Sequence, residues 1–373
     1  MGLQSISKHP VEGLTLPGHY YTSDEVFALE NERLFRHLWY FVGRGEQLRE
    51  PGDYFVEKVA GENLIITLDE QLRPRAFYNV CRHRGTRLVG EKEGCFERGR
   101  IVCPYHCWTY ACDGELLAAP QMDDRPDFRK EEWPLHEVGI EAWAGFLLVN
   151  LADHPCPIRE AFDRVWEKFR PWRLGELRVA HRKTYELETN WKLTFENFSE
   201  CYHCGPVHPG LSKLSPLRSA SNDLTEGLFL GGPMDLAFQS MTFSGRACAA
   251  TIRDLNEDQR RKVYYYTLMP NLLLAPHPDF VVCWRLDPQS ANRTRIVCEW
   301  LFEPEAVESP GFDPAEAIEF WDVTNRQDWE VCEQTFDGVS SDAYRPGPWS
   351  PTETMPRMFD REVLKLLGHA HLR

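Results

Sequence analysis

The sequence predicts an α+β protein, with a small all-β domain followed by a larger domain that combines an antiparallel sheet with a long helix. Three observations support this fold class. Short strand-like segments dominate residues 53–151, strands and helices are mixed after residue 155, and a long helical pattern covers residues 313–336. At roughly 150 residues per domain, a chain of 373 residues fits two domains.

A helix is expected near the N-terminus. Ser23 and Asp24 are N-cap candidates, and four apolar residues fall on or near one helix face, namely Phe27, Leu34, Phe35 and Leu38. We therefore divide the chain into an N-terminal helical segment (1–38) that packs on the larger domain, the small β domain (39–152) and the larger domain (153–373).

In the small domain, strands are predicted on either side of a turn at residues 61–63 and again at residues 145–149. Asp113-Gly114 predicts a hairpin turn. In the larger domain, residues 178–189 are expected to be extended, and residues 191–203 to be helical up to Gly205-Pro206. Residues 280–286 and 293–302 are expected to pair as antiparallel strands.

The long helix is predicted from Asp313 to about Phe336. Asp313 and Glu316 have the spacing of a capping box, with Pro314 at the first helical position. Asp337-Gly338 is expected to end the helix.

Charge and hydropathy exclude several kinds of partner. The formal net charge is −15, so a phosphate backbone would be repelled and no nucleic-acid partner is expected. The longest apolar stretch, residues 142–152, is far shorter than the roughly 20 residues of a membrane span. The N-terminal sequence lacks a secretory signal pattern, and we expect a cytoplasmic protein without a membrane partner.

The first candidate metal site consists of two Cys/His pairs in the small domain. Cys81 and His83 form one pair, and Cys103 and His106 form the other. Two thiolates and two imidazoles are the ligands of a Rieske [2Fe–2S] cluster. A structural zinc site also takes this donor set, but zinc fingers usually separate the Cys pair from the His pair. We interpret three other cysteines as buried packing residues, namely Cys95, Cys107 and Cys112.

The second candidate site contains His203, His208 and a distant carboxylate. Five positions do not share a helix face, so the chain must leave the helix between the two histidines, as Gly205-Pro206 would cause. Two histidines and one carboxylate form the facial triad of Fe(II) oxygenases. Asp328 is the candidate, because it lies on a largely uncharged face of the predicted long helix. A solvated Asp328 and a hydrolytic zinc site are the alternatives.

These motifs resemble a known family. The sequence CRHRG at 81–85, CPYH at 103–106 and Trp108 resemble the Rieske domain of Rieske non-haem iron oxygenases, although Cys107 departs from the usual Gly or Ala. The sequence NWK at 190–192, ENF at 196–198 and the histidines at 203 and 208 resemble the catalytic domain of that family. The resemblance extends from about Leu38 to Leu366.

The resemblance implies a helix-grip-like catalytic domain in which His203, His208 and Asp328 bind the mononuclear iron. Glu200 matches the catalytic acid that bridges the two metal sites across a subunit interface in a head-to-tail homotrimer. That acid is usually Asp. Glu at this position, together with Cys201 and Cys204, resembles the branch that acts on quaternary ammonium compounds such as choline, betaines and carnitine.

The function implied is that of the terminal oxygenase of a multicomponent monooxygenase. Such an enzyme uses O2 to hydroxylate, N-demethylate or cleave a quaternary or tertiary amine. The sequence has no credible G-x-G-x-x-G unit, so NAD(P)H oxidation is assigned to a separate reductase. The alternatives are an aromatic-ring hydroxylating oxygenase and a Rieske electron-transfer protein without oxygenase activity.

Two further features of the sequence each have two possible interpretations. The aromatic residues Tyr264–Tyr266, Phe280, Trp284 and Trp300 could form a cage for a quaternary ammonium, although most of them fit an ordinary core. Cys201 and Cys204 have the Cys-x-x-Cys spacing of a redox dithiol, but no thioredoxin-like βαβ pattern surrounds them.

Overall fold

The computed structural model describes residues 10–368, and the chain divides into two compact units. The smaller unit is Phe35–Asp163, and the larger unit combines Met1–Leu34 with Arg164–Arg373. The first nine residues of the predicted N-terminal segment and the last five residues of the predicted larger domain lie outside the described residues. Within residues 10–368, no helix has the length and hydropathy of a membrane span.

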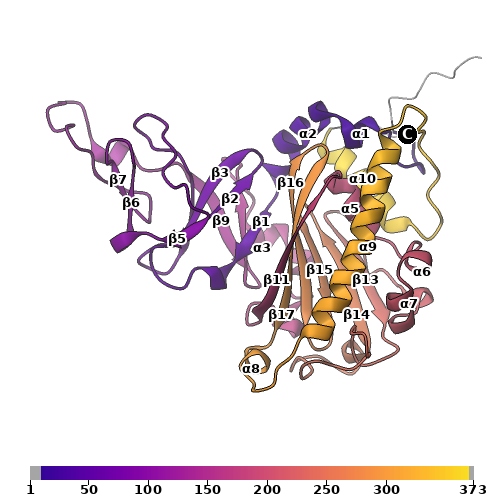
Figure 1. Cartoon of the computed structure of the whole chain (residues 1–373). Coiled ribbons are helices and arrows are strands. Elements are labelled where there is room, and N and C mark those ends of the chain that lie inside the picture. The colour runs from indigo at the N-terminus through magenta and orange to yellow at the C-terminus, as the bar shows by residue number, and fades with distance from the viewer. Residues whose placement is uncertain (1–9, 369–373) are drawn as a thin grey trace, which may run out of the picture. The chain divides into compact units, whose positions relative to one another are not determined.

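The smaller unit is built from two antiparallel sheets (Figure 1). The seven-stranded sheet has the order β1 (Tyr40–Arg44), β10 (Phe146–Asn150), β9 (Glu137–Trp143), β4 (Pro74–Tyr78), β3 (Glu62–Leu68), β2 (Asp53–Val59) and β5 (Glu93–Cys95). The three-stranded sheet has the order β6 (Arg100–Val102), β7 (Thr109–Ala111) and β8 (Leu116–Ala118). The short helix α3 (Ile158–Ala161) follows near the end of the unit.

The predicted hairpin at Asp113-Gly114 is confirmed, since it joins β7 to β8. Gly114 has φ +91°, a left-handed conformation that favours glycine, and a Cβ there would lie 2.6 Å from the Phe77 ring. The turn therefore packs directly on the core of the unit, and it fixes the β7–β8 sheet beside that core.

The larger unit contains a seven-stranded antiparallel sheet. Its order is β11 (Arg178–Leu187), β17 (Arg293–Phe302), β16 (Val281–Ser290), β15 (Leu272–Pro276), β14 (Lys262–Leu268), β13 (Phe229–Asp235) and β12 (Leu224–Glu226). The predicted extended segment at 178–189 and the predicted antiparallel pair at 280–302 are confirmed as β11, β16 and β17. The two sheet-based units confirm the α+β class.

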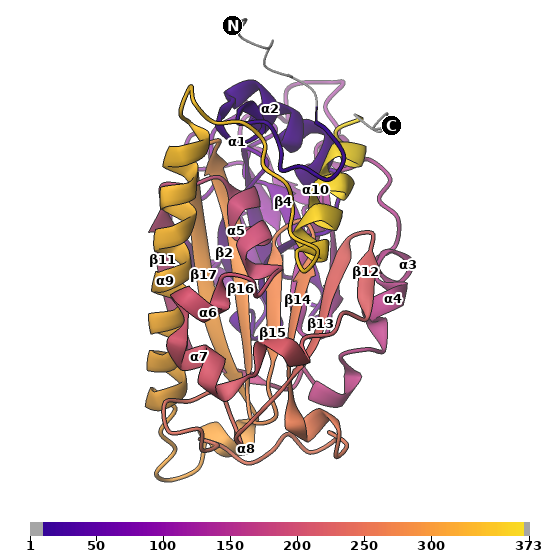
Figure 2. The ribbon, with the colours of Figure 1, turned by 90° about the vertical axis from the view of Figure 1, so that its right-hand side faces the viewer.

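Helices cover one face of this sheet (Figures 1 and 2). They are α5 (Trp191–Phe198), α6 (Cys204–Val207), α7 (Pro209–Leu214), α9 (Ala315–Val339) and α10 (Thr354–Leu366). The remaining α-helices in residues 10–368 are α1 (His19–Thr22), α2 (Asp24–Glu30), α4 (Asp163–Trp166) and α8 (Pro304–Val307). The predicted N-cap of α2 is confirmed, because the Ser23 side chain accepts hydrogen bonds from the backbone of Glu25 and Val26.

Both predicted ends of the long helix α9 were partly wrong. Asp313 accepts a hydrogen bond from the Ala315 backbone, but Glu316 accepts from Ser244 instead of closing a capping box. At the other end, the helix continues past Asp337-Gly338 to Val339. Gly338 does not adopt a positive φ, so it does not act as a helix terminator.

The predicted helix at 191–203 ends five residues early, at Phe198. The Glu200 carboxylate accepts hydrogen bonds from the backbone N–H groups of Tyr202 and His203, so the chain turns there. Pro206 lies inside the short helix α6 and does not break it, because proline is tolerated in a first turn. The chain therefore leaves the helix before His203, and not between the two histidines.

Helix α5 is anchored by a buried ion pair. Lys192 Nζ lies 2.5 Å from Glu30 Oε1 on α2, and both side chains have 0% exposure. Trp191 Nε1 donates to the other Glu30 oxygen at 2.8 Å. Next to this pair, Tyr21 donates to Glu196 at 2.9 Å. The contacts fix α5 against the N-terminal helices and thereby position the turn that follows α5.

Candidate metal centres and active site

Three side chains from two distant segments meet over the sheet of the larger unit. Asp328 Oδ1 on α9 lies 2.8 Å from His208 Nε2 and 3.3 Å from His203 Nε2. The donor atoms of the three residues all lie within 4.8 Å of one another. Two imidazole nitrogens and one carboxylate oxygen that lie this close together can bind a single metal ion.

The second nitrogen of each imidazole has its own partner. His203 Nδ1 contacts Glu200 Oε1 at 2.5 Å, and His208 Nδ1 contacts Gln327 Oε1 at 2.8 Å. A neutral imidazole that donates through Nδ1 presents the Nε2 lone pair to a metal. The two outer contacts therefore orient both Nε2 atoms toward the same point.

The local electrostatics also favour a cation at this point. Burial alone would raise the pKa of Asp328, but the hydrogen bonds from His203 and His208 outweigh burial and lower it. Burial alone would lower the pKa of His203, but Asp328 and Glu200 raise it to about 10. A metal ion replaces that proton and satisfies the same carboxylates, so the donor set fits a mononuclear iron.

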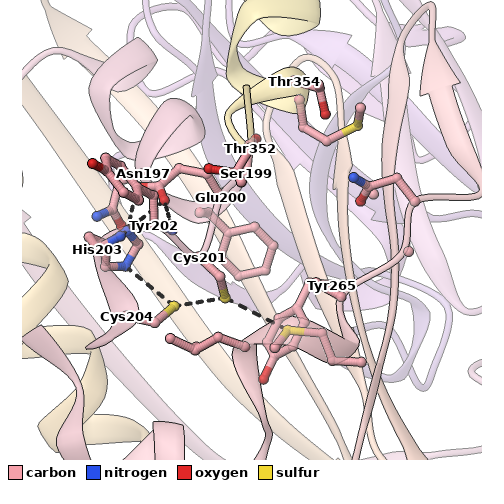
Figure 3. Close-up of a pocket in the computed structure, with 18 of the residues that line it drawn as sticks. Asn197, Ser199, Glu200, Cys201, Tyr202, His203, Cys204, Tyr265, Thr352 and Thr354 are labelled. Carbon is pink, nitrogen blue, oxygen red and sulfur yellow. Dashed lines mark hydrogen bonds and ion pairs between the residues drawn. The ribbon is translucent and has the colours of Figure 1, made fainter. Parts of the chain in front are cut away.

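The three residues line a cavity of about 530 Å³. Its wall includes the turn from Asn197 to Cys204 and the segment that leads into α10, as Figure 3 shows for Thr352 and Thr354. Apart from the imidazoles, three of its lining residues are charged: Glu200, Asp328 and Arg218. A small molecule in the cavity would lie beside the candidate metal position.

Of the aromatic residues considered from sequence, Tyr265 lines the cavity. Tyr264 and Tyr266 point to the opposite side of β14, where they pack against Trp172 and Phe169. Phe280, Trp284 and Trp300 are buried core residues and are not among the lining residues.

An aromatic cage for a quaternary ammonium in this cavity would therefore consist of Tyr265 and rings that the sequence did not suggest. Phe198 and Trp321 both contact Tyr265, with ring centroids 6.0 and 6.3 Å from it. The Tyr265 hydroxyl is buried and has no hydrogen-bond partner among the described residues.

The other candidate site lies in the smaller unit. Cys81 and Cys103 are each 2% exposed and belong to the core cluster that also contains Trp108 and Tyr110. Tyr110 Oη lies 3.4 Å from Cys81 Sγ and accepts a hydrogen bond from the Arg82 backbone. A metal-bound thiolate can only accept, so the tyrosine hydroxyl would donate to it.

The two histidines of this site face each other. The His83 and His106 rings have centroids 4.6 Å apart, and His83 stacks on Trp108 with ring planes 5° apart. His106 Nδ1 is buried without a hydrogen-bond partner among the described residues. A buried nitrogen of this kind calls for a ligand, so two buried thiols and two adjacent imidazoles fit a Rieske [2Fe–2S] cluster.

The interpretation of the neighbouring cysteines was partly wrong. Cys112 is buried as expected, but Cys95 and Cys107 are exposed. Cys107 has φ +56°, an uncommon conformation for a residue other than glycine, in the loop that carries Cys103 and His106. Its exposed side chain explains why a larger residue than the usual Gly or Ala is tolerated there.

Sequence reasoning assigned no role to Gln327, Trp321 or Arg218. A signal existed for Trp321, which lies on the same helical face as Asp328, two turns before it. Gln327 is adjacent to Asp328, but its contact with His208 depends on the path of the chain over 119 residues. Nothing local in the sequence marks Arg218 as a cavity residue.

Comparisons with known proteins agree with both sites. Residues 38–134 match the family model of the Rieske [2Fe-2S] domain. Residues 174–369, more than half of the chain, match the model of the ring hydroxylating alpha subunit (catalytic domain). The fold and the two sites thus define a Rieske-type oxygenase, an oxidoreductase with a [2Fe–2S] cluster and a non-haem iron.

Three individual proteins show what this chain is similar to within the family. The glycine betaine monooxygenase oxygenase subunit of Chromohalobacter salexigens is 31% identical, over 91% of this chain and 82% of that protein. The carnitine monooxygenase oxygenase subunit of Acinetobacter pittii is 36% identical over 55% of each chain. The crystal structure of the quaternary ammonium Rieske monooxygenase CntA with an inhibitor gives a TM-score of 0.82 at 26% identity, covering 98% of this chain and 100% of that one. This chain belongs to the family of Rieske oxygenase alpha subunits.

Proposed function

We propose that this chain is the terminal oxygenase of a multicomponent monooxygenase that acts on a quaternary or tertiary amine carrying a carboxylate. The observation that carries the proposal is the cavity in which a facial triad, an aromatic wall and one cationic side chain occur together. The names of the similar proteins, which act on glycine betaine and carnitine, support the same class of substrate.

Each metal site has its own ligands in this proposal. Cys81, His83, Cys103 and His106 hold the cluster, and His203, His208 and Asp328 hold the iron. When bound, the cluster supplies single electrons and the iron activates O2 for insertion of one oxygen atom into a C–H bond. A Rieske electron carrier would need the first set alone, so the second set favours an oxygenase.

The cavity suggests how an amine would be oriented. The faces of Phe198, Tyr265 and Trp321 attract a quaternary ammonium through cation–π interactions and exclude water from it. This places a methyl or methylene group of the amine within the cavity that Asp328 also lines. Hydroxylation at such a carbon leads to N-demethylation or C–N cleavage, because a carbinolamine breaks down to an amine and a carbonyl compound.

Arg218 is the proposed anchor for the substrate carboxylate. It lines the cavity from the short turn at Leu217–Ser219, and its guanidinium forms no ion pair with any residue in 10–368. Guanidinium groups bind carboxylates in a bidentate manner. Betaines and carnitine carry a carboxylate and choline does not, so Arg218 favours the first two.

Glu200 is proposed as the electron bridge. It already holds His203 Nδ1 at 2.5 Å, and its second oxygen is occupied by backbone N–H groups. A cluster histidine from a neighbouring subunit, His106 by the family pattern, would approach the same carboxylate in a homotrimer. Electrons would come from a separate NAD(P)H-dependent reductase.

A substrate screen tests the proposal. The holoenzyme is combined with a Rieske reductase and NADH, and O2 uptake and product are measured for glycine betaine, carnitine, choline and naphthalene. We expect coupled turnover with the carboxylated amines. Coupled turnover with naphthalene alone would instead establish an aromatic-ring oxygenase.

The Arg218→Gln variant tests the anchor. We expect KM for the carboxylated amine to rise at least about tenfold, the loss of one charge-assisted hydrogen bond, with KM for choline unchanged. Arg170→Gln is the matched control, because Arg170 is exposed and is not among the residues that line the cavity. Equal changes for both substrates would contradict a carboxylate anchor.

A further inference from the structure

Two thiols lie against each other in the wall of the oxygenase cavity. Cys201 Sγ and Cys204 Sγ are 2.7 Å apart, with the Cys204 thiol donating to Cys201 (Figure 3). Both residues line the cavity, and both are free thiols. Neither is a ligand in the proposed metal sites, so the proposed function leaves the pair without a role.

The backbone between the two cysteines already has a geometry that a disulfide can span. The Cys204 backbone N–H donates to the Cys201 carbonyl at 3.2 Å, which closes a turn of four residues. Such a turn keeps its end Cα atoms within about 7 Å, close to the range of disulfides. The sulfur atoms need to approach from 2.7 Å to only about 2.05 Å.

The environment of the pair exposes it to oxidants formed in the cavity. Cys201 is half-buried, and its sulfur also contacts Met234 Sδ at 3.7 Å. An oxygenase that activates O2 without productive substrate attack releases hydrogen peroxide, so peroxide is the oxidant that would reach this wall first. A thiol with a second thiol in contact forms a disulfide in preference to higher oxidation states.

We propose that Cys201 and Cys204 form a reversible disulfide on exposure to hydrogen peroxide, and that this bond suppresses oxygenase turnover. The Cys201 sulfur attacks the O–O bond, which yields a sulfenic acid and one water. The Cys204 sulfur then displaces the hydroxyl from that sulfenic acid, which forms the S–S bond and releases the second water. A dithiol reductant returns both thiols by exchange.

The suppression follows from the position of His203 inside the turn. His203 lies between the two cysteines in sequence, and its Nε2 is 4.0 Å from Cys204 Sγ. The same ring contacts Glu200 at 2.5 Å and Asp328 at 3.3 Å. Drawing the sulfurs together pulls on both ends of the turn, and a misplacement of about 1 Å at a reacting centre can cost about 100-fold in rate.

The pair is a modification site and not a dithiol oxidoreductase centre. Cys201 lies in the turn after α5, and Cys204 is the first residue of the short helix α6, which covers an antiparallel sheet and does not belong to a βαβ unit. The redox partner of the pair is therefore the oxidant formed in its own cavity, and no protein substrate is required.

The test uses the holoenzyme with both metal sites loaded. The protein is treated with hydrogen peroxide in the absence of reductase, remaining thiols are alkylated, and disulfides are located by peptide mass mapping. We expect a Cys201–Cys204 disulfide, a decrease in turnover of at least tenfold, and recovery of both on addition of dithiothreitol. The visible spectrum of the cluster monitors damage elsewhere.

Two variants separate the disulfide from other oxidation. Cys201→Ser and Cys204→Ser, each compared with its own untreated form, should lose the dithiothreitol-reversible component. Cys156→Ser, which changes an exposed cysteine in the smaller unit, should behave like the wild type. Absence of the disulfide by mapping, or its formation without loss of turnover, would overturn the proposal. Mapping does not require turnover, so it remains informative if the proposed substrate class is wrong.

Discussion

The two candidate metal sites differ in how they meet solvent. In the smaller unit, the cysteines are buried, but His83 is exposed and His106 is half-buried. In the larger unit, His208 is 2% exposed, and the donor atoms point into a cavity. The first site keeps its thiolates in the core and exposes the His83 imidazole, whereas the donors of the second site are buried or partly buried at the wall of a cavity.

The difference corresponds to two chemical tasks. An electron-transfer centre needs an accessible edge through which a partner can reach it, and the exposed His83 provides such an edge. A centre that activates O2 needs room for substrate and protection from bulk water. One chain can therefore carry both centres, provided that their ligands are disjoint.

The largest expected effect concerns Glu200, the proposed electron bridge between the two kinds of site. Glu200→Gln keeps the size of the side chain but removes its charge, so both sites should stay loaded while electron transfer to the catalytic iron falls roughly 10- to 100-fold or more. Stopped-flow absorbance can follow cluster reoxidation in the presence of substrate and O2. Reduction of the cluster by the reductase should stay near the wild-type rate, which serves as the internal control.

Unchanged reoxidation in a fully loaded Glu200→Gln protein would show that the carboxylate only holds His203. The two sites would then communicate by another route.

The second prediction concerns the stability of the larger unit, which contains the buried ion pair of Glu30 and Lys192. Glu30→Ala removes the carboxylate that neutralises the buried Lys192 ammonium, and loss of one partner of a buried pair costs about 3–5 kcal/mol. Thermal unfolding should show this loss together with weaker iron binding at the catalytic site, while the cluster spectrum is retained. Glu25→Ala, on an exposed position of the same helix, is the control. Equal stability of both variants would mean that the ion pair does not anchor α5.

The local parts of both sites could be predicted from the sequence, because their spacing is itself the signal. Each Cys/His pair spans at most four residues, and His203 and His208 lie in one short stretch. The strand pairs at β16 and β17 and the N-cap at Ser23 were readable for the same reason. Asp328 needed the additional argument that its helical face is uncharged.

The parts that could not be predicted depend on tertiary contacts. The end of α5 is set by the Glu200 carboxylate, which accepts two backbone N–H groups and ends the helix before any Gly or Pro. The pairing of Glu30 with Lys192 spans 162 residues. The lining of the cavity depends on which side of β14 a residue faces, which is why Tyr265 is included and its neighbours are not.

The smallest expected effect is a pH dependence confined to the larger unit. Burial raises the pKa of Glu196 to about 7, and burial and Glu196 also raise the pKa of Asp360. Tyr21, Tyr344 and Lys192 are the other titratable groups that act on this pair. A raised carboxyl pKa means that the folded state holds the proton more tightly than the unfolded chain.

The free energy of unfolding should therefore fall as pH rises from about 4.5 to about 7, by an amount on the order of 1 kcal/mol or more. Glu196→Gln should flatten this dependence in denaturant titrations between pH 5 and pH 8. A slope equal to that of the wild type would assign the pH dependence to other groups.

The central claim, that one chain holds two metal sites with disjoint ligands, is tested most directly by counting iron and acid-labile sulfide in the Asp328→Ala variant. The wild type should contain about three irons and about two sulfides per chain. Asp328→Ala should contain about two of each, keep the Rieske EPR signal and lose turnover, while Glu330→Ala, at an exposed position on the same helix, should match the wild type. Three irons in Asp328→Ala, or loss of the Rieske signal, would contradict the account.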